Sequence, residues 1–360
     1  MTYQRILMVK SHSMGVGDVL RSSAAWRVLK NKWPEAQLHL LFLSKHAGYP
    51  TEDFIRQHHL LASATFLTIR EGTPADPDAK RVPLSVTKQQ VIALSQRLQP
   101  DLVIDFEASG IRSSLVTRWV AKAVGAKSVG IAQFFGRELF YDFHAPSVKD
   151  YAGAQGLQIP MDYTERDFVA LAALGLYRDE TSIELQVLAD GVAYAQKLKK
   201  RLPAGKRVIG LNIGCGTPDA YPRRPQIDQV VKAMHAIASE GPYVCLLTGA
   251  PFEKSINEAF LHAFGTQPAG LEFIDCAGQT SLSELTSLIS LCDVFISSDS
   301  GPYHMAVALK KPTIAWFMYD EPAAYHRYDW CKCLVQPSAE QVAQAMLALL
   351  KKFSNEDICH

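Results

Sequence analysis

The sequence lacks several features that would place it in a specialised class of protein. No apolar run approaches the ~20 residues that cross a bilayer. Residues 1–15 lack the long apolar segment and small-residue cleavage site of a signal peptide, so we expect a cytoplasmic protein. The net charge is only +1, which argues against a surface that coats nucleic acid. A hydrophobic content of 48% and a charged content of 20% are ordinary for a globular protein.

Cysteine is scarce and scattered, with seven residues in 360. Four of these lie in or beside apolar runs and are expected to be small core residues: Cys215, Cys245, Cys276 and Cys292. A metal held near the C-terminus by Cys331, Cys333 and Cys359, with His360, is an alternative. The spacing of these cysteines matches no common zinc pattern, so we expect no metal there.

The length and the order of the predicted elements indicate two domains. A chain of 360 residues can bury two cores. Buried strands alternate with helices in both halves, which predicts an α/β protein with two Rossmann-like, doubly wound domains facing across a cleft. We place the N-terminal domain at residues 1–180, a connection at 181–205 and the C-terminal domain at 206–360.

The N-terminal half opens with a strand, a glycine turn and a helix. The strand is predicted at Arg5–Lys10 and the helix at Val19–Lys32, with Gly15 and Gly17 between them. The third glycine of the dinucleotide fingerprint is absent, which makes an NAD-dependent oxidoreductase the least favoured reading. Asp18 can serve as an acceptor or a general base. It can equally do no more than complement the helix dipole.

The most informative stretch of the C-terminal half is Val294–Phe317, which predicts a strand, a polar turn, a short helix and a second strand. A helix N-terminus offers unpaired N–H groups and partial positive charge, which suits a phosphate. Gly301 lets a ligand approach the backbone. Asp299 can accept from sugar hydroxyls, and His304 can donate to phosphate. The alternative is an ordinary strand–helix turn with Ser or Asp as the cap.

Three further polar features follow other predicted strands of this half, at Gly214–Thr217, Arg223-Arg224 and Thr248-Gly249. Because the carboxyl ends of parallel strands meet at one edge of a sheet, these features and the Asp299–His304 turn are expected to converge. Together they predict a site for a nucleotide diphosphate that needs no metal. In the N-terminal half, Arg112 lies on a basic helix that is either a solvated face or a contact for an anionic acceptor.

At this point the sequence resembles the heptosyltransferases of glycosyltransferase family 9, which have the GT-B fold. The resemblance extends over nearly the whole chain. The motifs that carry it are ILMVKSHSMGVGDVLRSSAAWRVLK, DLVIDFEASGIRSSL, LNIGCG with the following RRP, LLTGAPFE, and AGQTSLSELTSLISLCDVFISSDSGPYHMAVALKKPT. The last of these is highly specific in order and spacing.

The resemblance implies transfer of heptose from ADP-heptose to a lipopolysaccharide inner core or related glycan, with inversion and without a metal or other cofactor. Asp18 matches the family's general base, and Arg224 or Arg223 the cation that stabilises the departing diphosphate. The implied donor-binding residues are Gly214, Gly216, Thr217, Arg223, Thr248, Gly249, Glu253, Thr280, Asp299, Ser300, Gly301 and His304. The residues expected at the acceptor are Ser13, Arg21 and Arg112.

Some positions depart from the family pattern. Arg21 stands where the family often has His, and Arg223-Arg224-Pro225 lacks the tryptophan of the usual basic motif. Two other functions remain open: a nucleotide-sugar epimerase of the same fold, and a nucleotide-sugar-binding protein without catalysis. A lipid-linked acceptor would bring the protein to the cytoplasmic face of the inner membrane.

Overall fold

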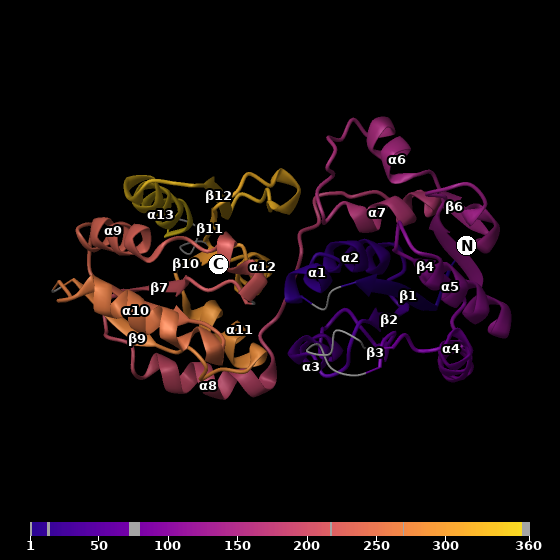
Figure 1. Ribbon diagram of the computed structural model, residues 1–360, viewed down its shortest axis with the longest axis horizontal. Helices are drawn as coiled ribbons and strands as arrows, with labels where there is room; N and C mark the ends of the chain where they lie inside the picture. Colours follow the sequence, from indigo (N-terminus) through magenta and orange to yellow (C-terminus); the bar gives the residue numbers. More distant parts are fainter. Residues whose placement is uncertain (1, 13–14, 72–79, 217, 269, 355–360) are drawn as a thin grey trace. The chain divides into compact units, whose positions relative to one another are not determined.

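The computed structural model divides into two compact units, Met1–Ile183 and Glu184–His360 (Figure 1). It describes residues 2–12, 15–71, 80–216, 218–268 and 270–354. Each unit is built on its own six-stranded sheet, in which the described neighbouring strands pair in parallel. Parallel strands require long crossover connections, and here helices supply most of them. The predicted fold class, two Rossmann-like α/β units, is confirmed.

The first sheet has the strand order β3-β2-β1-β4-β5-β6. Its strands are β1 (Arg5–His12), β2 (Gln37–Ser44), β3 (Ser63–Thr68), β4 (Leu102–Asp105), β5 (Lys127–Ile131) and β6 (Phe143–Ala145). The central strands read as apolar runs in the sequence because both faces of a parallel sheet are covered. The edge strands β3 and β6 are less apolar and are partly exposed, so hydrophobic pattern alone did not predict them.

The helices of the first unit are α1 (Val16–Leu20), α2 (Ser23–Lys32), α3 (Pro50–Arg56), α4 (Leu84–Leu98), α5 (Ile111–Val124), α6 (Val148–Ala154) and α7 (Arg166–Leu171), with 3₁₀ turns η1 (Arg137–Phe140) and η2 (Ala172–Leu174). The single helix predicted at Val19–Lys32 is instead α1 followed by α2. The break lies at Arg21-Ser22, where the Ser22 N–H donates to the Val19 carbonyl in a tighter turn.

The second sheet repeats this topology with the order β12-β11-β10-β7-β8-β9. Its strands are β7 (Arg207–Asn212), β8 (Tyr243–Thr248), β9 (Leu271–Asp275), β10 (Val294–Ser298), β11 (Thr313–Phe317) and β12 (Cys331–Val335). Counted within its unit, each sheet therefore has the order 3-2-1-4-5-6 of a Rossmann fold.

The second unit contains α8 (Ala189–Lys199), α9 (Ile227–Ala238), α10 (Lys254–Phe264), α11 (Leu282–Leu291), α12 (Gly301–Ala308) and α13 (Ala339–Ser354), with 3₁₀ turns η3 (Pro218–Arg223), η4 (Pro251–Glu253) and η5 (Pro322–Ala324). The expected connection at 181–205 contains α8, which packs against α11. The contact is close, since a Cβ on Gly191 would lie 2.2 Å from the Ser287 Oγ. Most of the expected connection is therefore part of the second unit.

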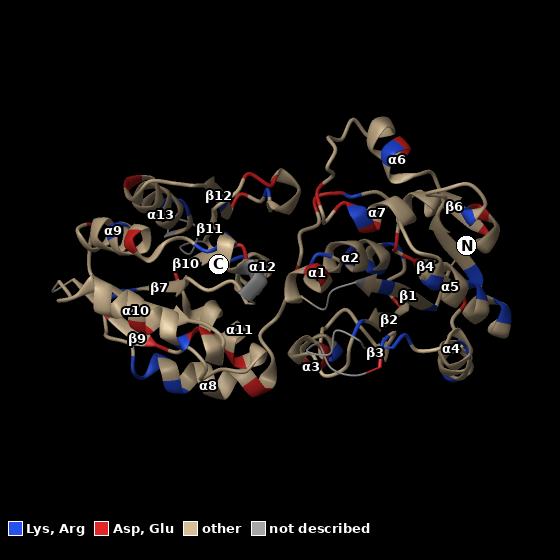
Figure 2. Cartoon of the chain, in the orientation of Figure 1, with Lys and Arg blue, Asp and Glu red and all other residues tan. Residues whose placement is uncertain are grey.

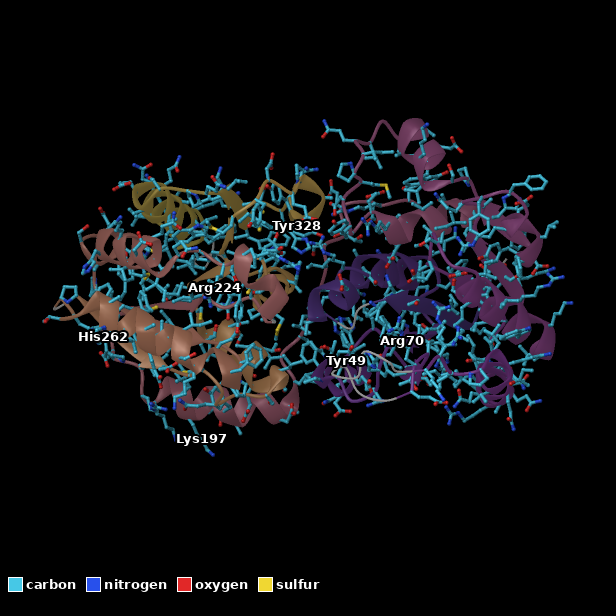
Figure 3. The ribbon with its side chains drawn as sticks, viewed as in Figure 1. Tyr49, Arg70, Lys197, Arg224, His262 and Tyr328 are labelled. Carbon is cyan, nitrogen blue, oxygen red and sulfur yellow. The ribbon has the colours of Figure 1, made fainter. Side chains whose placement is uncertain are left out.

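Basic and acidic residues are distributed over both units (Figure 2), and Figure 3 draws the side chains on the ribbon. Each unit has its own core of buried apolar side chains. The four cysteines that were predicted to be core residues are buried. In the part of the chain that the structure describes, no helix has both the length and the hydropathy needed to cross a membrane.

Candidate functional site

The strand order places one candidate binding region in each unit. Successive crossovers reverse direction between β1 and β4 in the first sheet and between β7 and β10 in the second. Ligands of open α/β sheets bind beyond the carboxyl ends of the strands at such a switch point. The segments that follow these strands are the ones that the sequence marked for chemistry: the Asp18 turn in the first unit, and the Gly214 and Asp299–His304 turns in the second.

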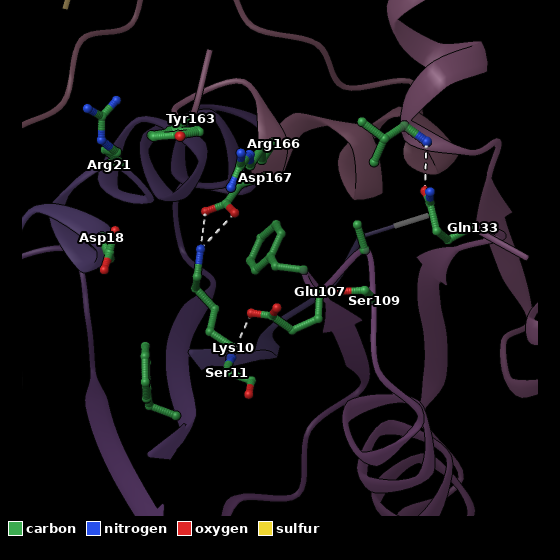
Figure 4. A pocket seen from close by; sticks show the side chains of 14 residues that line it. Lys10, Ser11, Asp18, Arg21, Glu107, Ser109, Gln133, Tyr163, Arg166 and Asp167 are labelled. Atoms are coloured by element: carbon green, nitrogen blue, oxygen red, sulfur yellow. Dashed lines mark hydrogen bonds and ion pairs between the residues drawn. The ribbon is translucent and has the colours of Figure 1, made fainter. Parts of the chain in front are cut away.

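In the first unit this region is a cavity of about 550 Å³ (Figure 4). Its walls come from the ends of β1 and β4, from α1, and from the segment that enters α7. The lining residues are Lys10, Ser11, Asp18, Arg21, Phe42, Phe106, Glu107, Ala108, Ser109, Gln133, Val148, Tyr163, Arg166 and Asp167. The cavity is thus rich in charged groups that sequence reasoning did not associate with Asp18.

Asp18 lies in the first turn of α1, is exposed, and lines this cavity. The turn before it is tight. A Cβ on Gly15 would lie 3.2 Å from the Asp18 Oδ2, so glycine at 15 leaves room for the carboxylate. The predicted base is therefore exposed at the switch point, where a ligand hydroxyl can reach it.

Lys10 lies on the floor of the cavity as part of an ion pair. Its Nζ is 2.7 Å from the Asp167 Oδ1 and also donates to the Ser22 Oγ at 2.7 Å. The two ionised side chains are only 12% and 6% exposed. Asp167 is 157 positions away in the chain, so only the tertiary structure could show this pair.

A buried network holds the loop after β4. The Asp105 carboxylate accepts from the Tyr141 hydroxyl at 2.7 Å, from the Glu107 N–H at 3.0 Å, and from Arg137 at 3.3 Å. Burial raises the pKa of Asp105 to about 6, even though the Arg137 charge acts in the opposite direction. Glu107, placed by this network, accepts from the Ser11 N–H at 2.7 Å and so ties the β4 loop to the end of β1.

The three residues expected at the acceptor do not lie together in the structure. Arg21 lines the Asp18 cavity, but its buried guanidinium donates to Thr164 at 3.3 Å and lies 3.7 Å from the Asp162 carboxylate. Arg112 lines a separate cavity of about 460 Å³. Ser13 lies outside the described residues. The structure therefore brings Arg21 to Asp18 and places Arg112 elsewhere.

The cavity at Arg112 is strongly basic. Its lining residues, all from the described part of the chain, include four cations and no carboxylate: Lys45, Arg70, Arg81 and Arg112. Burial, and secondarily the charge of Arg81, lower the pKa of Arg112. A backbone bridge joins Arg70 to Arg81. An anionic group would relieve the mutual repulsion of these side chains.

In the second unit the switch-point turn forms as predicted, with Ser300 as the N-cap of α12 and Pro302 in its first turn. Within the described residues, no side chain caps this helix. Ser300 instead accepts from the Asn212 Nδ2 at 3.0 Å and lies 3.2 Å from the Ser297 hydroxyl. Asn212, which sequence reasoning missed, also donates to the Gly214 carbonyl and accepts from Thr248 at 3.2 Å. One amide thus connects three of the predicted features.

Glu253 is buried and joins the loops that follow β7 and β8. Its Oε1 accepts from the Gly216 N–H at 2.9 Å and its Oε2 from the Ala250 N–H at 2.8 Å. A Cβ on Gly214 would lie 2.0 Å from the Glu253 Oε1, which explains why glycine occupies this position. The structure gives Glu253 a role in loop packing, and its contact with a nucleotide stays a prediction.

The two arginines after the second glycine turn are arranged differently. Arg223 Nη1 lies 3.3 Å from the Asp299 Oδ2, so two predicted donor contacts pair with each other. Arg224 lies over the ring of Tyr221, with its Cζ 4.5 Å from the ring centroid. The Arg223 side chain is 51% exposed and that of Asp299 11%, so the arginine end of this pair is accessible to an anion.

His304, in the first turns of α12, is mostly buried and contacts a second histidine. Its Nδ1 lies 2.9 Å from the Nε2 of His326, in the loop between β11 and β12. The backbone N–H of His326 donates to the Tyr303 hydroxyl at 2.8 Å, which fixes that loop on α12. One of the two facing nitrogens must carry the proton, so the tautomers of His304 and His326 are coupled. The sequence offered no signal for this pair.

The remaining predicted donor residues lie around this region or outside the description. Thr248 ends β8, and Gly249 follows it, with its carbonyl accepting from the Gly278 N–H at 2.9 Å. Thr280 is half-buried and directly precedes Ser281, the N-cap of α11. Thr217 lies outside the described residues.

The cysteine alternative stays open. Cys331 and Cys333 lie on β12 with their Sγ atoms 3.9 Å apart, while Cys359 and His360 lie outside the described residues. Across the described ranges, no group of three or more His, Cys, Asp or Glu side chains is placed to hold a metal ion.

Comparison with known proteins tests the resemblance. A family model described as glycosyltransferase family 9 (heptosyltransferase) matches residues 160–356, more than half of the chain. The chain belongs to glycosyltransferase family 9. The match includes the switch-point turn of the second unit. The two units with this strand order are the GT-B fold, as predicted.

The similar proteins are named as heptosyltransferases. The lipopolysaccharide core heptosyltransferase OpsX of Haemophilus influenzae is 37% identical over 68 residues, which cover 18% of this chain and 20% of that protein. The lipooligosaccharide heptosyltransferase 2 of Campylobacter jejuni is 25% identical over 146 residues, covering 39% and 44%. The matches thus span less than half the length of these curated relatives. The structure of the Escherichia coli ADP-heptose lps heptosyltransferase II covers 98% of this chain and 100% of its own, with a TM-score of 0.68 at 18% identity. At that identity the likeness shows the shared fold.

Proposed function

We propose that this family 9 member is an inverting, metal-independent glycosyltransferase that transfers heptose from ADP-heptose to a lipopolysaccharide inner-core or related glycan acceptor. The observation that carries the proposal is the turn between β10 and α12. There a helix begins at a switch point without a side-chain cap among the described residues, beside Arg223 and His304. Such a turn suits the diphosphate of a nucleotide sugar.

The second unit would hold the donor. The first N–H groups of α12, with Ser300 and Gly301, would bind phosphate oxygens, and His304 would donate a further hydrogen bond. Arg223 and Arg224 would stabilise the charge on the departing diphosphate, which removes the need for a metal. Asp299, once released from Arg223, would accept from sugar hydroxyls. Adenine is the expected base because a similar structure is named as an ADP-heptose enzyme.

The first unit would supply the base. The Asp18 carboxylate takes the proton of an acceptor hydroxyl as that oxygen forms a bond to the anomeric carbon of heptose. The bond from that carbon to the diphosphate oxygen breaks on the opposite face, so ADP leaves with the electron pair and the configuration inverts. The reaction therefore requires the Asp18 carboxylate to reach the acceptor hydroxyl while that oxygen attacks the anomeric carbon.

The acceptor would enter the Asp18 cavity. Arg21, committed to Thr164 and Asp162, would act by fixing this wall, while Ser13 and Arg112 are proposed as direct contacts. The basic cavity at Arg112 would receive an anionic group of the acceptor, since its four cations favour a carboxylate or a phosphate.

The donor can be identified by thermal unfolding with ADP-, GDP-, UDP- and dTDP-sugars. A ligand that binds only the folded state raises the melting temperature, and 100 times its Kd contributes about 2.7 kcal/mol. ADP-heptose should give the largest shift. A larger shift with another base would overturn the donor assignment.

Transfer itself can be measured by mass spectrometry with ADP-heptose and a lipopolysaccharide inner-core acceptor. We expect a glycosylated acceptor of inverted anomeric configuration, formed at the same rate with and without EDTA. A rearranged nucleotide sugar without any glycosylated product would indicate an epimerase. Donor binding with neither product would indicate a protein that only binds nucleotide sugars.

A further inference from the structure

We infer that the first unit binds the surface of an anionic lipid bilayer through its α4–α5 face, which comprises Lys88, Arg118 and Lys122 together with Phe135 and Leu139. This inference is independent of sugar transfer, because binding to vesicles can be measured without donor or acceptor. It rests on charge, on exposed apolar side chains, and on their adjacency.

The charge of this face is of one sign. α4 and α5 carry five cations and no Asp or Glu along their whole length (Figure 2): Lys88, Arg97, Arg112, Arg118 and Lys122. The chain as a whole is balanced, with 37 basic and 36 acidic residues, so an unbalanced pair of neighbouring helices is a local property. A basic helix face without carboxylates attracts an anionic surface.

The cations lie on one continuous surface. Lys88, Arg118 and Lys122 line a single shallow cavity of about 490 Å³, together with Trp119 and Phe140. The Lys88 Nζ lies 5.8 Å from the centroid of the Trp119 ring. Leu115 lines both this cavity and the basic cavity at Arg112, so the two cationic regions adjoin. The positive field therefore extends along both helices.

Apolar side chains are exposed beside these cations. Arg118 donates to the Leu139 carbonyl at 3.0 Å, which attaches η1 to α5. Leu139 is 74% exposed, and Phe135, in the same loop, is fully exposed. Among the described residues of the first unit, nine large apolar side chains are exposed, and six of them belong to α4, α5 and the loop through η1: Leu84, Val86, Ile111, Phe134, Phe135 and Leu139. Exposed large apolar residues gathered in this way mark an interaction surface.

A bilayer fits this combination better than other partners. Aromatic and aliphatic side chains insert at the headgroup level while lysine and arginine remain in the anionic layer. Glu138 is the one carboxylate of residues 134–140, and it is only half-exposed. A nucleic acid would match the charge but not the exposed Leu139. A second copy of this chain would have to offer the opposite charge, which α4 and α5 themselves do not carry.

The test is sedimentation of the full chain with vesicles of phosphatidylcholine alone and of phosphatidylcholine mixed with phosphatidylglycerol. We expect binding to the mixed vesicles only, weakening as salt rises. Lys88→Gln with Lys122→Gln should lower the partition coefficient about 30-fold, since each cation near an anionic surface contributes about fivefold. Phe135→Ser should lower it further by removing an apolar anchor.

The matched control is Lys197→Gln with Lys199→Gln, two lysines of α8 whose loss should leave vesicle binding unchanged. All variants should unfold at the wild-type temperature, because Lys88, Lys122 and Phe135 are exposed. Equal binding to both vesicle types, or an equal loss in both lysine pairs, would overturn the inference. So would a lysine-dependent dimer seen by analytical ultracentrifugation without vesicle binding.

Discussion

The switch points of the two units have the same strand order but different chemistry. In the first unit the loops are held by charge: Lys10 with Asp167, and Asp105 with Arg137. In the second unit Asn212, a neutral amide, connects Gly214, Thr248 and Ser300. The Glu253 carboxylate there accepts from backbone N–H groups and, among the described residues, forms no ion pair. The difference accords with the proposed roles, because a general base is a carboxylate that a ligand hydroxyl can reach whereas anion binding uses backbone N–H donors at a helix start.

The largest effect is expected at Asp18, the carboxylate at the switch point of the first unit. Asp18→Asn should lower the rate of transfer by about 10²–10⁴-fold, because an amide cannot take the acceptor proton. The affinity for ADP, measured by calorimetry, should not change. Asp53→Asn, on an exposed carboxylate of α3, is the matched control and should transfer at the wild-type rate. Near-normal transfer by Asp18→Asn would remove Asp18 as the base.

The next effect concerns the buried charge at Asp105. Its pKa is raised from 3.8 to about 6, chiefly by burial, so the folded state holds the proton more tightly than the unfolded state. The stabilisation from that proton is present below about pH 4 and is lost as the pH rises through 6. Relative to Asp105→Asn, the wild-type free energy of unfolding should fall by about 3 kcal/mol over this range. Parallel pH profiles from urea unfolding would contradict the assignment.

The loop packing around Glu253 in the second unit can be tested at Gly214. Gly214→Ala places a methyl group 2.0 Å from the Glu253 carboxylate, which both of its backbone bonds hold in place. We expect a loss of about 1–3 kcal/mol in the free energy of unfolding. Gly153→Ala, in α6 where a Cβ meets no atom within 4 Å, is the control and should be neutral or slightly stabilising.

A smaller effect should follow from the histidine pair. His326→Phe removes the hydrogen bond that couples the tautomer of His304 to that of His326, so ADP affinity should fall about fivefold to tenfold and its pH profile should change. His326→Gln keeps a polar partner and should restore most of the affinity. His304→Ala tests the phosphate role of His304 directly, apart from the role of His326. If it leaves ADP binding intact, the phosphate role of His304 fails, and the role of His326 with it.

The smallest effect on folding is expected at the Arg223–Asp299 pair of the second unit. Arg223→Ala should lower the free energy of unfolding by about 0.5–1 kcal/mol, since the arginine is half exposed although Asp299 is largely buried. Its effect on turnover should be larger, because the same guanidinium is proposed to stabilise the departing diphosphate. A stability loss without a change in turnover would make Arg223 a structural residue and leave the leaving-group role to Arg224.

The sequence predicted much of this fold because the central strands of a parallel sheet are continuous apolar runs. The runs that contain β1, β4, β7 and β10 were identified for that reason, and the glycine turns after β1 and β7 pointed to the correct edge of each sheet. Edge strands such as β3 and β6 have mixed composition, and the break between α1 and α2 follows from one local turn. Neither the edge strands nor this break gives a strong periodic pattern of apolar residues in the sequence.

By itself the sequence determined the α/β class, the family, and the turns at Asp18 and at Asp299–His304, since each depends on residues that are neighbours in the chain. Only the tertiary structure decided which distant groups those turns meet. Asp167 reaches Lys10 across 157 positions, Asn212 reaches Ser300 across 88, and Arg112 lines a basic cavity apart from Asp18. The physical reason is that a parallel sheet gathers the ends of strands that are far apart in sequence, and local pattern carries no record of which side chains then touch.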